Sequence, residues 1–207
     1  MSAKTTGNGI PPLILASTSP YRRALLERLG IVFTVAAPDV DESPWPQELP
    51  SETALRLAEA KARAVAKRHP EVVVIGSDQV AECDGEPVGK PGSRESAVRQ
   101  LQRLSGRTVV FHTGVAVVAG LRCQRALVDV ASTFRTLSGE EIDAYLDREQ
   151  PYDCAGSVKS EALGIALFEK IVSDDPTALI GLPLIALTRM LRAEGLDVLL
   201  TGRCAPA

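Results

Sequence analysis

Short apolar runs alternate with amphipathic segments along the chain, and this alternation predicts a mixed α/β protein. The first run, Leu13–Ala16, indicates a strand, and a turn rich in hydroxyl groups leads from it into a helix. Ser19 suits the N-cap of that helix and Pro20 its first residue, because a helix leaves its first amide free. Gly30 then marks the end of the helix, and residues 31–37 predict a second strand.

The middle of the chain combines a long helix with a buried strand. Ser51 is expected to cap the helix, which runs to about His69 and has one apolar face. Residues 71–75 contain an unbroken β-branched run, which suits a strand covered on both faces. We expect this strand to end at residues 76–79, before a further helix over 93–105.

The second half of the chain continues with long strands and two more helices. Residues 108–118 and 126–137 predict a hairpin around 120–125, and a capping box at Ser138 opens a helix to about Arg148. A terminal helix is expected over 183–194. No repeat or linker divides the chain, so we predict one domain over 11–207, with an elongated sheet flanked by helices, after a disordered tail at 1–10.

Composition narrows the class of protein. The chain has 207 residues, of which 45% are hydrophobic and 24% charged, as in ordinary globular proteins. The net charge of −3 gives no global basic surface, which argues against a nucleic-acid partner.

The ends of the chain and its cysteines bear on location. Residues 1–9 lack the apolar core of a signal peptide, and the most apolar stretch, 179–187, is too short to span a bilayer. The cysteines are far apart in sequence and form no metal-binding pair: Cys83, Cys123, Cys154 and Cys204. We therefore expect a soluble, cytoplasmic protein with reduced cysteines and no membrane partner.

A candidate phosphate site lies at the start of the first predicted helix. Ser17, Thr18 and Ser19 supply hydroxyl groups, and Arg22 and Arg23 lie in the first turn, where the helix dipole favours carboxylates instead. Free amides, hydroxyls and guanidinium groups together would bind a phosphate well. The alternative is a capped surface helix whose arginines are simply solvated.

Three further residues carry candidate chemistry. Lys61 lies in the middle of the apolar face of its helix, so its side chain either reaches solvent at the edge or points into a cleft. Asp78 follows a buried strand, where α/β folds place their sites, although an aspartate can also cap a turn. Lys90 belongs to a Gly-Lys-Pro motif that lacks the spacing of a P-loop.

Several motifs in the right order resemble the Maf-like nucleotide pyrophosphatases. They are ASTSPYRRALLERLG, VDES, the lysine of RLAEAKA, GSDQV, VGKP, YDCAGSVKSEALGIALFEKI and DDPTALIGLPLIAL, spread from Leu13 to about Arg192. GSDQV and CAGSVKSE are similar to the branch that hydrolyses 7-methyl-GTP. The pyrimidine branch would carry two arginines after Ser-Pro and a threonine after the aspartate, where this chain has Tyr21 and Gln79.

The resemblance implies a fold of the inosine-triphosphatase-like type, an elongated twisted mixed sheet flanked by helices with a central cleft. It implies hydrolysis of a small-molecule nucleoside triphosphate to the monophosphate and pyrophosphate. A divalent cation, Mg²⁺ or Mn²⁺, is implied as cofactor, a homodimer as assembly, and removal of modified nucleotides as the role. Rival functions are hydrolysis of a pyrimidine or another modified nucleotide, and non-catalytic nucleotide binding in the regulation of septum formation.

The resemblance also assigns roles to nine positions. Asp78 matches the proton acceptor that activates the attacking water, and Glu42 matches a carboxylate that holds the metal together with Asp78. Four positions match groups that bind the phosphates or neutralise their charge: Ser17, Arg22, Lys61 and Lys90. Three positions where the branches differ are expected to select the base: Tyr21, Gln79 and Glu161.

Two points on the metal and the base follow from the chemistry of these positions. Asp39 and Asp41 lie near Glu42, so which of the three contacts the metal stays open. A 7-methylated guanine is positively charged, so stacking on Tyr21 would gain a cation–π contribution of roughly 0.5–2 kcal/mol. Glu161 could accept hydrogen bonds from the N1–H and amino groups of guanine.

Overall fold

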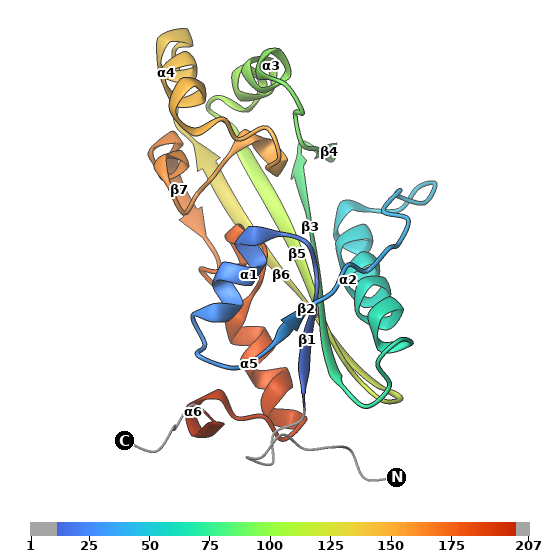
Figure 1. The fold of residues 1–207 in the computed structure, drawn as a ribbon. Helices are drawn as coiled ribbons and strands as arrows, with labels where there is room; N and C mark the ends of the chain where they lie inside the picture. The colour runs from blue at the N-terminus through green and yellow to red at the C-terminus, as the bar shows by residue number, and fades with distance from the viewer. Residues whose placement is uncertain (1–11, 202–207) are drawn as a thin grey trace.

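Seven strands form one mixed sheet in the computed structural model, which describes residues 12–201 (Figure 1). They are β1 (Leu13–Ala16), β2 (Thr34–Val35), β3 (Val73–Cys83), β4 (Glu86–Val88), β5 (Thr108–Ala119), β6 (Arg122–Phe134) and β7 (Phe168–Val172). Their order is β2-β1-β3-β5-β6-β7, and β4 pairs with β3 beside this path. β1 is parallel to β2 and β3, whereas the other pairings are antiparallel.

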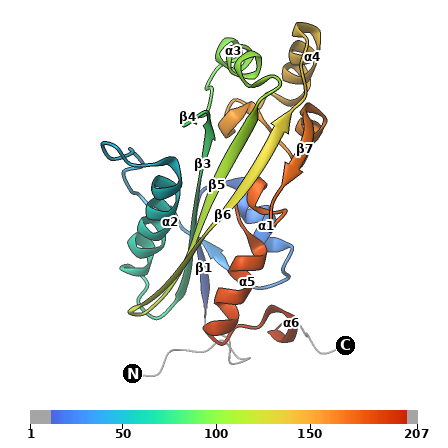
Figure 2. The same ribbon diagram turned by 180° about the vertical axis from the view of Figure 1, so that it is seen from behind.

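Helices cover both faces of the sheet and one of its ends (Figure 2). They are α1 (Pro20–Glu27), α2 (Pro50–Ala66), α3 (Arg94–Leu104), α4 (Gly139–Glu149), α5 (Leu184–Ala193) and α6 (Val198–Thr201), with 3-10 turns η1 (Ala155–Ser157), η2 (Leu163–Leu167) and η3 (Ala178–Ile180). α2 lies along one face, α1 and α5 lie on the other, and α3 and α4 lie together at the far end (Figures 1 and 2).

Buried side chains pack on both faces of the sheet. Between α2 and the sheet they are small, as Ala58, Ala62 and Ala116 show. On the opposite face, larger side chains such as Leu26 and Leu187 fill the space under α1 and α5. The thin layer under α2 matters for the site because it lets this helix lie close to β3 and β5.

The predicted architecture, an elongated mixed sheet flanked by helices, is confirmed. β1 has the predicted bounds, and the Ser19 hydroxyl caps α1 by accepting a hydrogen bond from the backbone amide of Arg22 at 3.4 Å. The capping box of α4 is also confirmed. The Ser138 amide donates to the Glu141 carboxylate at 2.8 Å, and the Glu141 amide donates to the Ser138 hydroxyl at 3.2 Å.

The bounds predicted for two strands are wrong. The strand after α2 does not end at residues 76–79 but continues to Cys83, because β5 pairs with it from Val73 through Glu82. The strand β6 covers Arg122–Phe134 rather than residues 126–137, and Gly120 and Leu121 suffice for the turn before it. Local composition could not reveal either pairing partner.

The bounds of one helix and of one further strand also differ from the prediction. α2 begins at Pro50 with Leu49 at the N-cap position, not Ser51, because Glu52 accepts a hydrogen bond from the Leu49 amide at 3.0 Å. This helix ends at Ala66 rather than at about residue 69. The second strand covers only Thr34–Val35 instead of 31–37, because β1 offers pairing to these two residues alone.

Both ends of the chain lie outside the residues that the structure describes. The predicted tail at 1–10 lies outside the described residues, as does Cys204. Cys83, Cys123 and Cys154 carry free thiols. Between residues 12 and 201, no helix is both long enough and apolar enough to cross a membrane.

Candidate active site

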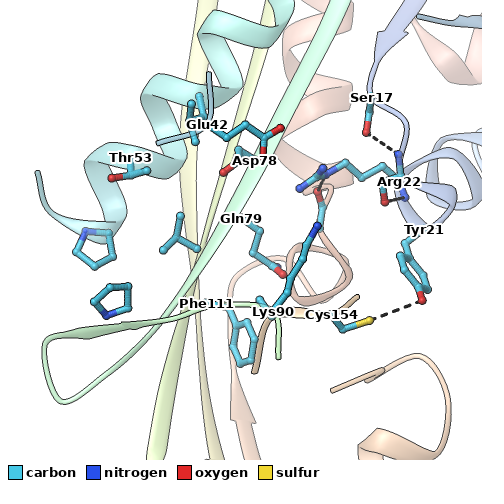
Figure 3. A pocket seen from close by; sticks show the side chains of 18 of the residues that line it. Ser17, Tyr21, Arg22, Glu42, Thr53, Asp78, Gln79, Lys90, Phe111 and Cys154 are labelled. Atoms are coloured by element: carbon cyan, nitrogen blue, oxygen red, sulfur yellow. Dashed lines mark hydrogen bonds between the residues drawn. The ribbon is translucent and has the colours of Figure 1, made fainter. Parts of the chain in front are cut away.

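A cleft of about 960 Å³ lies between α2 with its preceding loop on one side and the start of α1 on the other (Figure 3). This volume is at the upper end of the range for small-molecule sites. All nine positions assigned from the family resemblance line the cleft: Ser17, Tyr21, Arg22, Glu42, Lys61, Asp78, Gln79, Lys90 and Glu161. Residues from six separate segments of the chain therefore meet in one place.

The ammonium group of Lys61 joins two carboxylates inside the cleft. Its Nζ lies 2.6 Å from Oδ1 of Asp78 and 2.7 Å from Oε1 of Glu42. Lys61 and Asp78 are only 4% and 7% exposed, whereas the Glu42 side chain is 59% exposed. Lys61 therefore points into the cleft and does not reach solvent at the edge of its helix.

Glycines in the sheet allow α2 to bring Lys61 this close. A Cβ atom on Gly76 would lie 2.2 Å from the carbonyl oxygen of Ala58, and one on Gly114 would lie 2.4 Å from that of Ala54. Neither position can carry a side chain unless the helix moves away. The glycines in β3 and β5, together with the alanines of α2, thus set the distance between Lys61 and the sheet.

Asp78 lies within β3, opposite Gly114 of β5, and not at the end of a strand. The alternative of a turn cap is therefore wrong. The neighbouring parallel strand β1 ends at Ala16, which pairs with Gly76. Because the residue that pairs with the end of β1 lies two positions before Asp78, one side of β3 is open there, and the chain after β1 forms the hydroxyl-rich turn beside it.

The turn after β1 is organised by its own hydroxyl groups. The amide of Ser19 donates to Oγ of Ser17 at 3.1 Å, so the Ser17 hydroxyl keeps its proton for a ligand. Ser17 is buried and borders the cleft directly before α1. A helix of eight residues starts here, with its free amides and positive dipole end beside the cleft.

The two arginines of α1 have different positions. Arg22 is half-buried in the cleft wall, and its Nε donates to the carbonyl oxygen of Gly181 at 2.9 Å. Burial lowers the pKa of Arg22, while the charges of Asp78 and Glu42 oppose this, and a guanidinium stays protonated in any case. Arg23 is exposed and pairs with Glu27 at 2.9 Å, so it is a surface residue.

The carboxamide of Gln79 has a fixed orientation in the cleft. Its Nε2 donates to Oγ1 of Thr113 at 3.0 Å and to the carbonyl oxygens of Ala178 and Leu179 at 2.9 and 3.0 Å. These partners all accept, because Thr113 uses its own proton on Ala178. The Gln79 nitrogen is thereby fixed, which leaves its oxygen as an acceptor for a ligand (Figure 3).

Tyr21 lies at the other end of the cleft, next to a thiol and a carboxylate. Its hydroxyl donates to Oδ2 of Asp153 at 3.4 Å, and the Cys154 thiol donates to that hydroxyl at 3.6 Å (Figure 3). Burial above all, then Cys154, Asp153 and Glu161, hold the pKa of Tyr21 above its usual value. Tyr21 is therefore a neutral aromatic hydrogen-bond donor.

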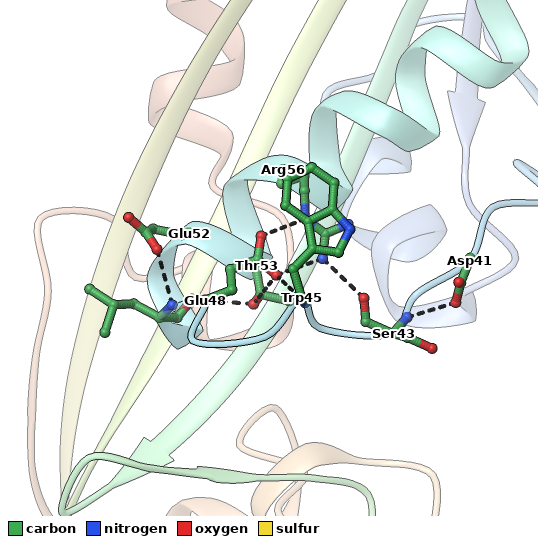
Figure 4. A network of polar contacts seen from close by, with 8 residues as sticks. Asp41, Ser43, Trp45, Glu48, Glu52, Thr53 and Arg56 are labelled. Carbon is green, nitrogen blue, oxygen red and sulfur yellow. Dashed lines mark hydrogen bonds and ion pairs between the residues drawn. The ribbon is translucent and has the colours of Figure 1, made fainter.

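The loop that carries Glu42 is fastened to α2 by a network that the sequence analysis missed (Figure 4). Glu48 accepts from Nη2 of Arg56 at 2.7 Å, from Thr53 at 2.8 Å and from the Trp45 amide at 3.0 Å. The Arg56 pair lowers the pKa of Glu48 to about 2. The Cζ atom of Arg56 also lies 4.3 Å from the centroid of the Trp45 ring. An arginine five residues before a cleft-facing lysine gave no separate signal in the sequence.

The network leaves one acid of the loop free to face Lys61. Asp39 pairs with Arg68 at 3.2 Å, and Asp41 accepts from the Ser43 amide at 2.9 Å. Only Glu42 of the three reaches Lys61. Glu42 and Asp78 together form the donor set that suits a hard divalent cation, which in phosphate-binding sites takes one or two carboxylates and shares the substrate's oxygens.

A helix N-terminus, three basic side chains and a carboxylate pair in one cleft define an α/β protein of the class that binds nucleotide phosphates. The family described as Maf-like protein matches residues 12–194, and the chain belongs to this family. The resemblance found in the sequence is thus confirmed.

Known proteins align with the chain along most of their length. It is 62% identical over 197 residues to a 7-methyl-GTP pyrophosphatase of Bordetella pertussis, covering 95% of this chain and 98% of the relative. It is 61% identical over 188 residues to one of Aromatoleum aromaticum, covering 89% and 96%. A structure of the Staphylococcus aureus Ham1 protein is 19% identical, with a TM-score of 0.44 over 60% of this chain and 72% of that one.

Proposed function

We propose that this chain is a pyrophosphatase that hydrolyses 7-methyl-GTP to 7-methyl-GMP and pyrophosphate. The observation that carries the proposal is the position of Lys61, which joins Asp78 and Glu42 in a cleft that Arg22 and Lys90 also line. The names of the two relatives, one from Bordetella and one from Aromatoleum, support 7-methyl-GTP as the substrate. Removal of modified nucleotides is the cellular role that fits this activity.

The reaction divides between a proton acceptor and several charge-neutralising groups. A water attacks the α-phosphorus, its proton passes to Asp78, and the bond from the α-phosphorus to the bridging oxygen breaks to release pyrophosphate. Negative charge grows on the leaving group as that bond breaks. Lys61, Lys90 and Arg22 supply fixed positive charge to the triphosphate, and the Ser17 hydroxyl and the α1 amides add hydrogen bonds.

The carboxylates of Glu42 and Asp78 would suit a divalent cation, Mg²⁺ or Mn²⁺, because such ions prefer oxygen ligands. Glu42 and Asp78 would hold it, and when bound it supplies positive charge to the phosphate oxygens. Glu42 comes from a loop that the Glu48–Arg56 pair holds against α2. The position of this ligand therefore depends on that pair as well as on the length of the loop.

Tyr21, Gln79 and Glu161 are the residues that would select the nucleotide base. Tyr21 would stack on the charged ring of 7-methylguanine, with a cation–π gain of roughly 0.5–2 kcal/mol. The free oxygen of Gln79 and the carboxylate of Glu161 would accept hydrogen bonds from base N–H groups. Uracil and cytosine offer a smaller ring and a different set of donors.

The test is release of pyrophosphate from a panel of 7-methyl-GTP, GTP, UTP, CTP and dTTP in the presence of Mg²⁺. We expect a strong preference for 7-methyl-GTP, and a loss of several orders of magnitude in kcat for Asp78→Asn. The matched control is Asp174→Asn, the same change at an exposed acid outside the cleft. A preference for pyrimidines would overturn the substrate, and no turnover at all would favour a nucleotide-binding regulator.

A further inference from the structure

The acidic side chains that line the cleft fall into two groups. Four of them have basic partners: Asp39 pairs with Arg68, Glu48 with Arg56, and Glu42 and Asp78 with Lys61. Within residues 12–201, the other two, Asp153 and Glu161, form no ion pair. Among the described residues, the cleft thus holds two carboxylates that no arginine, lysine or histidine side chain pairs with.

Both of these carboxylates lie near the same aromatic ring. Asp153 accepts from the Tyr21 hydroxyl at 3.4 Å, and the negative charges of Asp153 and Glu161 both help to keep the pKa of Tyr21 high. The thiol of Cys154 lies 3.6 Å from the Tyr21 hydroxyl and 3.5 Å from Oδ1 of Asp153. The Tyr21 hydroxyl is therefore held from two sides.

This end of the cleft is suited to a cation with a flat ring. Like charges near each other without a counter-ion favour a ligand that brings the opposite charge. An aromatic face attracts a cationic ring, and carboxylates attract it further. The basic residues Arg22, Lys61 and Lys90 line the same cleft, so one nucleotide could meet positive groups with its phosphates and negative groups with its base.

We infer that Asp153 is a specificity-determining residue that selects nucleotides with a positively charged base over those with a neutral base. The inference rests on the proposed function and deepens it, because methylation at N7 is what makes the guanine ring cationic. Asp153 does two things: its charge favours the cationic base, and its hydrogen bond fixes the ring of Tyr21. Glu161 contributes charge and hydrogen-bond acceptance, but within the described part of the chain no hydrogen bond joins it to Tyr21.

The experiment compares kcat/KM for 7-methyl-GTP and for GTP in four proteins: wild type, Asp153→Asn, Asp153→Glu and the control Asp174→Asn. Asparagine keeps an oxygen that can accept from Tyr21 but loses the charge, whereas glutamate keeps the charge. Affinities for the products 7-methyl-GMP and GMP, measured by calorimetry, give a readout that does not depend on turnover.

We expect Asp153→Asn to lower the ratio of the two kcat/KM values about ten-fold, which corresponds to roughly 1.4 kcal/mol. The product affinities should shift in the same direction, Asp153→Glu should keep most of the preference, and Asp174→Asn should leave the ratio unchanged. An unchanged ratio in Asp153→Asn, or an equal fall for both substrates, overturns the inference. A wild-type protein without preference for 7-methyl-GTP overturns the proposed function itself, before any variant is compared.

Discussion

Replacing Gly76 with alanine tests whether the close approach of α2 to the sheet positions Lys61 for its proposed role. The new Cβ would lie 2.2 Å from the Ala58 carbonyl oxygen and 2.7 Å from the Ala62 amide nitrogen, where ordinary contacts are 3.4–4 Å. Because both atoms belong to the helix backbone, neither can rotate away, and α2 has to move out by about 1 Å to reach ordinary contact.

The size of the effect follows from two opposing contributions. Alanine in place of glycine reduces the conformational freedom of the unfolded chain, which stabilises a protein by about 0.4–1 kcal/mol where the native conformation tolerates it. Overpacking in a tight core costs about 1–3 kcal/mol, and the short contacts to backbone place this variant at the high end. We therefore expect a net loss of about 2–2.6 kcal/mol in the free energy of unfolding.

The same movement should reduce activity. A displacement of about 1 Å would stretch the 2.6 Å contact between Lys61 and Asp78 beyond hydrogen-bond distance, and misplacement of this size can cost about 100-fold in rate. Urea unfolding followed by circular dichroism measures the stability, and pyrophosphate release from 7-methyl-GTP measures kcat. Nucleotide affinity should change less than kcat.

Gly139→Ala is the matched control. Gly139 is the first residue of α4, has no atom within 4 Å of the added Cβ, and needs no left-handed backbone. It should leave both stability and kcat close to wild type. The reasoning fails if Gly76→Ala behaves like this control. Lost stability with unchanged kcat would also contradict it, because the helix would then not transmit its position to Lys61.

Three further predictions concern single side chains. Lys61→Met should lower kcat at least 1,000-fold and destabilise the fold by roughly 3 kcal/mol, because the buried Asp78 loses its partner. Steady-state kinetics measure the change in kcat, and urea unfolding measures the loss of stability. Arg56 lowers the pKa of Glu48 from 4.5 to about 2, so the stability from this pair is present above pH 4.5 and is lost as the pH falls toward 2. The Glu48→Gln variant should therefore be less stable than wild type near neutral pH, and its free energy of unfolding should fall less steeply in acid. Burial raises the pKa of Cys154 to about 11, so iodoacetamide should modify this thiol about ten-fold more slowly at pH 8 than it modifies an exposed cysteine. Peptide mapping measures the two rates, and equal rates would contradict the burial of Cys154.

The sequence was sufficient for features that depend on local rules. Ser19 and Ser138 cap helices as predicted, because a hydroxyl next to free amides needs no distant partner. Lys61 was recognisable as unusual, because a charge in the middle of an apolar face has few explanations. The motifs around Asp78 and Arg22 carried the family, and their order along the chain made the combination specific.

Features that depend on pairing between distant segments could not be predicted. The strand β3 runs through Asp78 because β5 pairs with it, and no local property of the segment reports that partner. The Glu48–Arg56 pair joins a loop to a helix and looked like ordinary surface charge in the sequence. Gly181, whose carbonyl accepts from Arg22, becomes significant only when residues far apart in the chain meet.

The central claim is that this cleft splits the α–β phosphoanhydride of 7-methyl-GTP by attack of water on the α-phosphorus. Hydrolysis in water enriched in oxygen-18, with the products separated and weighed by mass spectrometry, tests it most directly. The account predicts one heavy oxygen in 7-methyl-GMP and none in pyrophosphate, with the reaction lost in Asp78→Asn. Label in pyrophosphate, release of single phosphate with a nucleoside diphosphate, or full turnover by Asp78→Asn would contradict it.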